Sequence, residues 1–166
     1  TPAPASIQAS PPIDGGKVGA LTLKAPSITL KERGLVTSSS GSNSSDAGNI
    51  LVITDILTLK DGSQLKSNKV EGTGRAGSIL ITATDDVRLM DGSSIQSSTT
   101  SQLGGSGGSI NITSGHSVAL NNDSLITASS TGPGNAGNIS IDAGNQLILQ
   151  NSSLTTEANQ ASGGKI

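Results

Sequence analysis

Residues 107–113 read Gly-Gly-Ser-Ile-Asn-Ile-Thr, and close variants of this stretch stand at residues 47–53, 76–82 and 136–142. In each copy a glycine is followed by two apolar residues that are separated by one position. Side chains alternate across a β-strand, so apolar residues two positions apart indicate a strand with one buried face. The recurrence of one short strand at a nearly constant distance predicts a chain of stacked structural repeats.

The glycine before the alternating residues marks each repeat. It recurs 27 to 31 residues apart, at Gly19, Gly48, Gly77, Gly108, Gly137 and Gly164. The apolar pairs that follow it are Leu21 and Leu23, Ile50 and Val52, Ile79 and Ile81, Ile110 and Ile112, and Ile139 and Ile141. This period predicts coils that begin near residues 19, 48, 77, 108 and 137, with a sixth coil begun at residue 164.

Each repeat contains two further strand-like segments. The second apolar pairs are Ile28 and Leu30, Leu57 and Leu59, Val87 and Leu89, Val118 and Leu120, and Leu147 and Leu149. A turn such as Asp61-Gly62-Ser63 follows, because Gly, Asp and Asn accept the unusual backbone angles of corners. The third apolar position and the small residue two places later are Val36 and Ser38, Leu65 and Ser67, Ile95 and Ser97, Ile126 and Ala128, and Leu154 and Thr156.

These three short strands cannot bury their apolar residues within one repeat. Parallel stacking of the repeats places equivalent residues in interior columns, which predicts an all-β parallel β-helix, or β-solenoid, of about five coils with about 29 residues each. We expect a single solenoid domain at residues 16–166. Residues 1–15 are rich in proline and are expected to form an extended N-terminal segment.

The composition excludes several classes of function. The chain has no Cys, Phe, Tyr or Trp, so disulfides and thiolate metal sites are excluded and the interior is aliphatic. The net charge is −2 and the basic residues are scattered, which argues against nucleic-acid binding. No apolar run approaches the roughly 18 residues of a membrane span.

The chemically reactive residues form no recognisable catalytic or metal-binding pattern. His116 is the only histidine and is interpreted as a solvated turn residue. Asp85, Asp86 and Arg88 resemble the charged groups of β-helical polysaccharide lyases, but we expect Gly115 or Ser114 beside Asp85 in the next coil. No carboxylate ladder is therefore predicted, and we expect no enzymatic activity, no cofactor and no metal.

Two surfaces are candidates for assembly. Leu51, Ile53 and Leu80 occupy outward positions of the first strand, where they predict an apolar patch for lateral contact with a neighbouring rod, or with a segment packed over it. Gly164, Lys165 and Ile166 begin a coil, and an unpaired strand edge there is a template for end-to-end pairing.

The stretches at residues 76–98 and 104–141 resemble the repeat body of filamentous haemagglutinin-like exoproteins, the secreted partners of two-partner secretion systems, in the style of the cyanobacterial members. The resemblance covers residues 16–166. It implies a right-handed β-helix, export through an outer-membrane transporter, and a role at the cell surface or in the extracellular matrix. The motifs of the family's secretion domain have no counterpart in this sequence, so secretion follows from the resemblance alone.

We therefore expect a non-catalytic, extracellular structural or adhesive segment, such as a stalk or a fibre subunit. Its expected partners are other copies of the chain or neighbouring rods. An alternative is an adhesin module whose loops bind a cell-surface glycan. A more distant alternative is an enzyme of the polysaccharide-lyase type, because one fold hosts unrelated functions.

Overall fold

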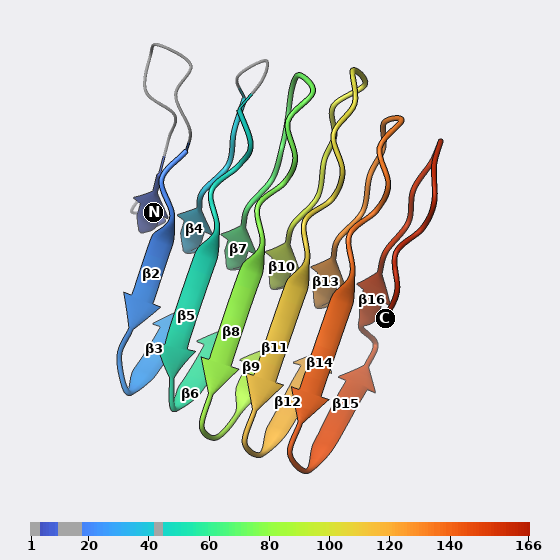
Figure 1. The fold of residues 1–166 in the computed structure, drawn as a ribbon. Helices are drawn as coiled ribbons and strands as arrows, with labels where there is room; N and C mark the ends of the chain where they lie inside the picture. Colours follow the sequence, from blue (N-terminus) through green and yellow to red (C-terminus); the bar gives the residue numbers. More distant parts are fainter. Residues whose placement is uncertain (1–3, 10–17, 42–44) are drawn as a thin grey trace.

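The chain forms a β-solenoid in which every coil contributes one strand to each of three parallel sheets (Figure 1). The computed structural model describes residues 4–9, 18–41 and 45–166, and within these ranges it contains strands, turns and loops but no helix. The prediction of about five coils, with three strands in each, is confirmed.

Sheet B holds the strands that follow the repeated glycine, and sheet C holds the second strand of each coil. Sheet B consists of β2 (Leu21–Lys24), β5 (Ile50–Thr54), β8 (Ile79–Ala83), β11 (Ile110–Ser114) and β14 (Ile139–Ala143). Sheet C consists of β3 (Ser27–Leu30), β6 (Ile56–Leu59), β9 (Val87–Leu89), β12 (Ser117–Asn121) and β15 (Gln146–Gln150).

Sheet A holds the third strand of each coil and one strand more. It consists of β1 (Ser6–Gln8), β4 (Leu35–Thr37), β7 (Gln64–Lys66), β10 (Ser94–Gln96), β13 (Leu125–Thr127) and β16 (Ser153–Thr155). Part of the proline-rich N-terminal segment therefore belongs to the solenoid, because Ile7 pairs with Val36. The expected domain boundary at residue 16 lies outside the described residues.

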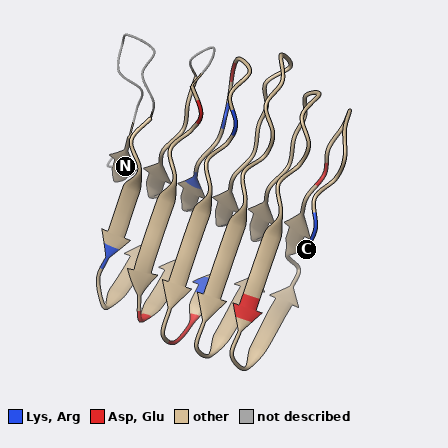
Figure 2. Cartoon of the chain, viewed as in Figure 1, with Lys and Arg blue, Asp and Glu red and all other residues tan. Residues whose placement is uncertain are grey.

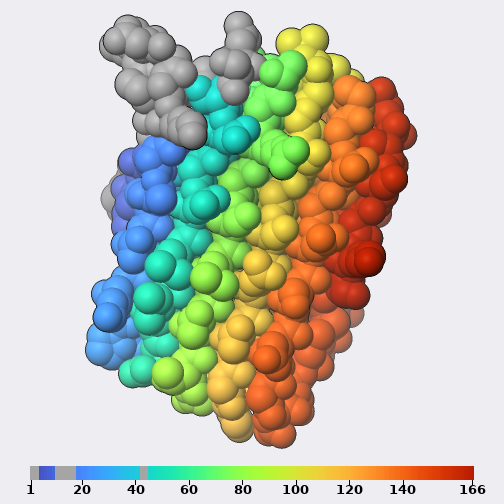
Figure 3. Space-filling model, in the orientation of Figure 1, coloured from blue at the N-terminus to red at the C-terminus, as the bar shows by residue number. Residues whose placement is uncertain are grey.

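The coil is right-handed. In Figure 1, β2 runs downwards in front, β3 returns upwards behind it, and successive coils advance to the right. Figure 3 shows the result on one face, where each coil forms a band beside the next. The handedness implied by the family resemblance is thus present, as expected for parallel strands joined by crossovers.

The interior columns lie in the predicted register. Ile50, Ile79 and Ile110 are neighbours in sheet B, and each is almost completely buried. Leu65, Ile95 and Ile126 form the equivalent column in sheet A. At the two ends of the rod the columns are open: Leu21 and Leu23 are half-buried, and Leu147 and Leu149 are exposed.

The Asp-Gly-Ser motifs form the corner between sheets C and A. Asp61 and Gly62 have φ angles of 57° and 71°, and Asp91 and Gly92 have 56° and 72°. This left-handed region favours Gly and tolerates Asp and Asn. The fourth coil places Asn122 and Asp123 at the same corner, with φ angles of 53° and 61°, so one corner geometry persists although its sequence changes.

The repeated glycine is required by a close approach between coils. A Cβ on Gly77 would lie 2.3 Å from the carbonyl oxygen of Gly48 and 2.5 Å from the hydroxyl oxygen of Ser67. The same two contacts surround Gly48 and Gly108 one coil before and after. We call this line of glycines and the serines beside it, Ser38, Ser67 and Ser97, the glycine–serine seam.

The seam serines also hold the coils together. Ser38 Oγ donates to Gly19 O at 2.7 Å, and Ser67 Oγ donates to Gly48 O at 2.6 Å. Ser97 makes the same bond to Gly77 O. In the fourth coil Ala128 takes the place of the serine, so that position has no hydroxyl to donate.

Candidate functional site

The corner between sheets B and C carries a column of polar side chains whose type changes along the stack. Backbone hydrogen bonds run from Asp85 N to Asp55 O, from His116 N to Asp85 O and from Asn145 N to His116 O. The four residues therefore occupy equivalent positions in four successive coils. We call Asp55, Asp85, His116 and Asn145 the corner column; Figure 2 shows acidic residues at the turns after β5 and β8.

This column corrects the expected alignment of Asp85. The coil that contains Asp85 and the next coil are 31 residues apart, both at the repeated glycine and in the pairing of Val87 with Val118. The residue beside Asp85 is therefore His116, and not Gly115 or Ser114. A period near 29 places the partner one or two residues too early.

Asp86 lies beside the corner column and is held by a guanidinium, an imidazole and a backbone amide. Its side chain is 9% exposed. Asp86 Oδ1 accepts a hydrogen bond from Ser117 N at 3.1 Å and lies 3.0 Å from His116 Nδ1, while Oδ2 is paired with the Arg88 guanidinium. Burial alone would raise the pKa of Asp86, but the hydrogen bond with His116, the charge of Arg88 and the Ser117 amide together hold that pKa below its usual range.

His116 is thus not a solitary turn residue. Its Nδ1 faces Asp86 and lies 3.8 Å from Asp85 Oδ1, and its Nε2 lies 3.5 Å from the side-chain amide of Asn145. The interpretation of His116 as a solvated turn residue leaves out the two carboxylates that coil stacking places beside it. The 31-residue spacing between Gly77 and Gly108 could have revealed these carboxylates, because His116 stands 31 residues after Asp85.

The expected apolar patch lies on the outer face of sheet B. Leu51 and Leu80 are direct neighbours across β5 and β8; Leu80 is 42% exposed, Ile53 is 37% exposed and Leu51 is half-buried. Leu51 and Leu80 line a shallow depression of about 400 Å³ that is bordered by Thr22 and Asn111. The structure therefore brings Leu51 and Leu80 together, with Ile53 beside Leu51 on the same strand face.

The predicted beginning of a sixth coil is also in place. Gly164 lies against Gly137 as the earlier repeated glycines lie against one another. Lys165 N donates to Asn138 Oδ1 at 3.0 Å, and Lys165 O accepts from Ile139 N at 2.9 Å. Ile166 is 69% exposed.

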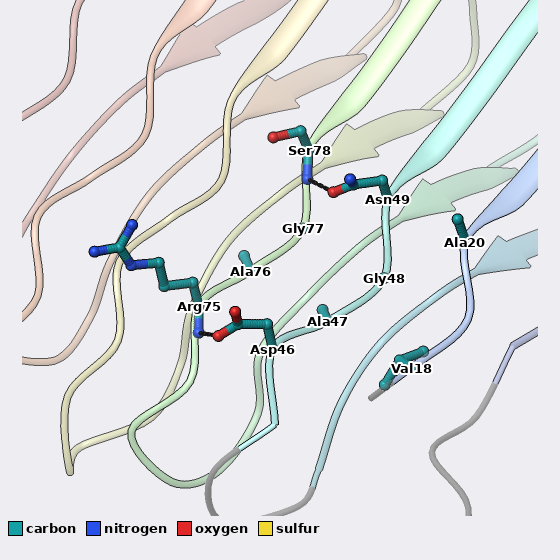
Figure 4. A pocket seen from close by; sticks show the side chains of 10 residues that line it. All are labelled: Val18, Ala20, Asp46, Ala47, Gly48, Asn49, Arg75, Ala76, Gly77 and Ser78. Carbon is teal, nitrogen blue, oxygen red and sulfur yellow. Dashed lines mark hydrogen bonds between the residues drawn. The ribbon is translucent and has the colours of Figure 1, made fainter. Parts of the chain in front are cut away.

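A shallow groove of about 300 Å³ lies where the coil-closing loops meet sheet B (Figure 4). Its small side chains include Ala47 and Ala76. Asp46 Oδ1 accepts a hydrogen bond from Arg75 N at 2.7 Å, and Asn49 Oδ1 accepts one from Ser78 N at 2.8 Å. The side-chain oxygens of Asp46 and Asn49 thus join adjacent coils by hydrogen bonds. The Arg75 side chain extends away from these oxygens in Figure 4.

The sequence interpretation also missed a buried lysine in the stacked loops. Lys69 is completely buried, and its Nζ donates to Ser45 O at 2.6 Å and to Ser40 Oγ at 3.3 Å. Desolvation lowers the pKa of Lys69, while the charges of Asp46 and Glu71 oppose the shift. Lys69 stands in a column of isolated bridges with Ser40 and Thr99, so its role is to hold the loop stack.

The comparisons with known proteins identify no relative: no family model, no curated protein and no solved structure matches the chain. No helix in the described part of the chain has the length and apolar character needed to cross a bilayer.

Proposed function

We propose that the chain is a non-catalytic structural or adhesive rod segment of a secreted surface protein, of the filamentous haemagglutinin-like type that its repeats resemble. The observation that carries this proposal is the continuity of the three parallel sheets, which run through all five coils without a break. The sequence resemblance supports export through an outer-membrane transporter and a place at the cell surface or in the extracellular matrix.

The fold suits a rod because each coil is joined to the next at many points. Backbone ladders in three sheets are reinforced by the glycine–serine seam inside and by isolated bridges between the closing loops, such as Lys69 with Thr99. In such a stack each coil contacts only its neighbours, so length is gained by adding coils while the contacts remain the same. Reach and stiffness are therefore direct consequences of the repeat.

The outer face of sheet B supports the proposal of lateral contact between rods. Leu51 and Leu80 are adjacent apolar side chains with Ile53 beside them, and this apolar group is bordered by polar residues such as Thr22 and Asn111. Removing apolar surface from water favours association. We therefore propose neighbouring rods, or other copies of the chain, as the partners of this face.

The test is to place charge on this face and measure association. The double variant Leu51→Lys, Leu80→Lys should stay folded by circular dichroism and lose concentration-dependent association in sedimentation velocity and side-by-side pairing in electron microscopy. The matched control is Thr29→Lys, Thr58→Lys, which changes two paired outward positions of sheet C. Association that survives in the sheet B variant, or that is lost equally in the control, would contradict lateral contact through Leu51 and Leu80.

A glycan-binding role is the second candidate, and the groove of Figure 4 is the observation that favours it. The groove is open and has small side chains, with the Arg75 guanidinium nearby. We expect a glycan ligand to shift the amide resonances of Ala47 and Ala76 in a nuclear magnetic resonance titration. Unchanged resonances across a panel of surface polysaccharides would leave the structural role as the only proposal.

A further inference from the structure

Three groups of the metal-ligand type converge at the corner between sheets B and C. They are the carboxylates of Asp85 and Asp86, which stand between β8 and β9, and the imidazole of His116, which stands one coil later between β11 and β12. One ligand atom from each residue can be chosen so that all three lie within 4.8 Å of one another. Two atoms that bind one ion at about 2.1 Å lie at most about 4.2 Å apart; His116 Nδ1 is already within this limit of both carboxylates, at 3.0 Å from Asp86 Oδ1 and 3.8 Å from Asp85 Oδ1.

The site is open on one side and fixed on the other. The side chains of Asp85 and His116 are about half exposed, whereas Asp86 is almost fully enclosed. An ion can therefore approach from solvent, and water molecules can complete its coordination. Asp86 would supply its Oδ1 while Oδ2 remains paired with Arg88.

The residues around the three groups would orient them. Ser117 N holds Asp86 Oδ1 at 3.1 Å, and the Asn145 side-chain amide lies 3.5 Å from His116 Nε2. The oxygen and nitrogen of an amide can be exchanged by a half-turn, which turns Asn145 into an acceptor for the Nε2 proton. Such a partner on the second ring nitrogen fixes the tautomer in which Nδ1 is free to bind a metal.

The type of ion follows from the ligands and from the charge. Calcium takes six to eight oxygen ligands, but this site offers two carboxylates, and one of these is shared with a guanidinium. An imidazole nitrogen with carboxylate oxygens suits Zn²⁺ and similar first-row divalent ions. Two carboxylates and one arginine leave a net charge of −1, which attracts a cation.

We propose that Asp85, Asp86 and His116 form a binding site for a first-row divalent metal ion of the Zn²⁺ type. The ion would join the coil of β8 and β9 to the coil of β11 and β12, because its ligands come from both. It would replace the direct contact between His116 and Asp86 by a bridge and would stabilise the folded rod by binding to it.

The experiment is a titration of the whole 166-residue chain with ZnCl₂ near neutral pH, followed by calorimetry and by the nuclear magnetic resonance signals of the His116 ring. We expect one ion per chain and a thermal midpoint that rises with Zn²⁺ concentration. His116→Gln should weaken the affinity by at least about tenfold, and Asp85→Asn should weaken it measurably. Both side chains are exposed, so both variants should fold.

The matched control is Asp123→Asn, which removes one acidic residue at another corner, where a φ of 61° suits Asn. This variant should bind Zn²⁺ as the original chain does, and CaCl₂ at the same concentration should leave the His116 signals unchanged. The proposal is overturned if Zn²⁺ leaves the His116 ring signals unchanged at millimolar concentration. It is also overturned if His116→Gln retains the affinity or if Asp123→Asn loses it.

Discussion

The glycine–serine seam and the corner column run through the same coils at opposite ends of sheet B, yet they are built in opposite ways. The seam repeats a glycine at every step, so Gly48, Gly77 and Gly108 meet the same two contacts. The corner column places Asp55, Asp85, His116 and Asn145 in equivalent positions, so its chemistry changes along the stack from two carboxylates to an imidazole and an amide. The seam determines how closely the coils stack. At the corner, the same stacking places unlike side chains next to one another.

This difference separates stability from chemistry in a repeat protein. A residue that recurs in every coil is required by a contact that every coil makes, such as the close approach of Gly77 to the Gly48 carbonyl. A residue that occurs once, such as His116, is not required by such a repeated contact. Its neighbours in the adjacent coils are determined by the register in which the coils pair. The predictions below test the two halves of this contrast.

The largest effect is expected at the seam from Gly77→Ala. The new Cβ would clash with the Gly48 carbonyl and with Ser67 Oγ, and the backbone carbonyl cannot move away without separating the coils. We expect a loss of about 3 kcal/mol or more of unfolding free energy, measured by urea denaturation. Gly19→Ala is the control, because it alters the same repeat position in the first coil, where no atom lies within 4 Å of the added carbon. Equal losses in both variants would break the steric account.

Removing one seam hydroxyl should have a smaller effect. In Ser67→Ala the carbonyl of Gly48 loses the hydroxyl that lies 2.6 Å away inside the rod. We expect a loss of about 2 kcal/mol, the cost of leaving a buried acceptor without that partner, measured by thermal and urea unfolding. Ser140→Ala, on an exposed position of β14, should change stability little. A loss as small as that of the Ser140 variant would show that the seam hydroxyls are dispensable.

At the corner, Asp86→Asn should cost about 1.5 kcal/mol near neutral pH, because the bonds to Arg88 and His116 lose their ionic character. The lowered pKa of Asp86 gives the dependence on pH. Its contribution is present above the unfolded-state pKa of about 3.9 and is lost as the pH falls through the folded-state pKa.

Stability curves of the original chain and of Asp86→Asn should therefore converge in acid. Urea unfolding at several pH values between neutral and strongly acidic conditions measures this convergence. Curves that stay parallel throughout would mean that the carboxylate of Asp86 carries no favourable charge interaction at the corner.

The smallest effect is a gain. Ala128 replaces the seam serine in the fourth coil, and Ala128→Ser would restore a hydroxyl where Ser38, Ser67 and Ser97 have one. We expect about 0.5 kcal/mol of added stability from one new hydrogen bond to Gly108 O, seen as a higher urea midpoint. A fall in the midpoint would show that the fourth coil has no room for the hydroxyl and differs from its neighbours.

The contrast also explains what the sequence alone predicts. The three strands, the interior columns and the corner turns recur in every coil, so periodicity was sufficient to place Ile79, Leu89 and Ile95 inside. The partnership of Asp85 and His116 occurs once and depends on a single lengthened coil. An error of one or two residues in alignment hides it completely.

Burial of single polar residues was equally out of reach of the repeat pattern. Lys69 and Asp86 are enclosed by residues about 24 to 31 positions away, and a lysine or an aspartate in a polar segment is usually exposed. The extra strand β1 was hidden for another reason. Its partner β4 lies beyond a proline-rich stretch, and no repeated glycine precedes Ile7, although Ile7 stands one period of 29 residues before Val36.

The most direct test of the account is a disulfide across the stack, because every argument above depends on the coil register. The chain has no cysteine, so pairs can be introduced alone. Thr82 and Thr113 are direct partners in sheet B, at a separation that suits a disulfide. Thr82→Cys with Thr113→Cys should therefore oxidise quantitatively within one chain, as read by mass spectrometry. Thr82→Cys with Asn111→Cys, two residues out of register, should not. Rapid intramolecular oxidation of the second pair, or failure of the first in a folded chain, would contradict the register on which the seam and the corner both depend.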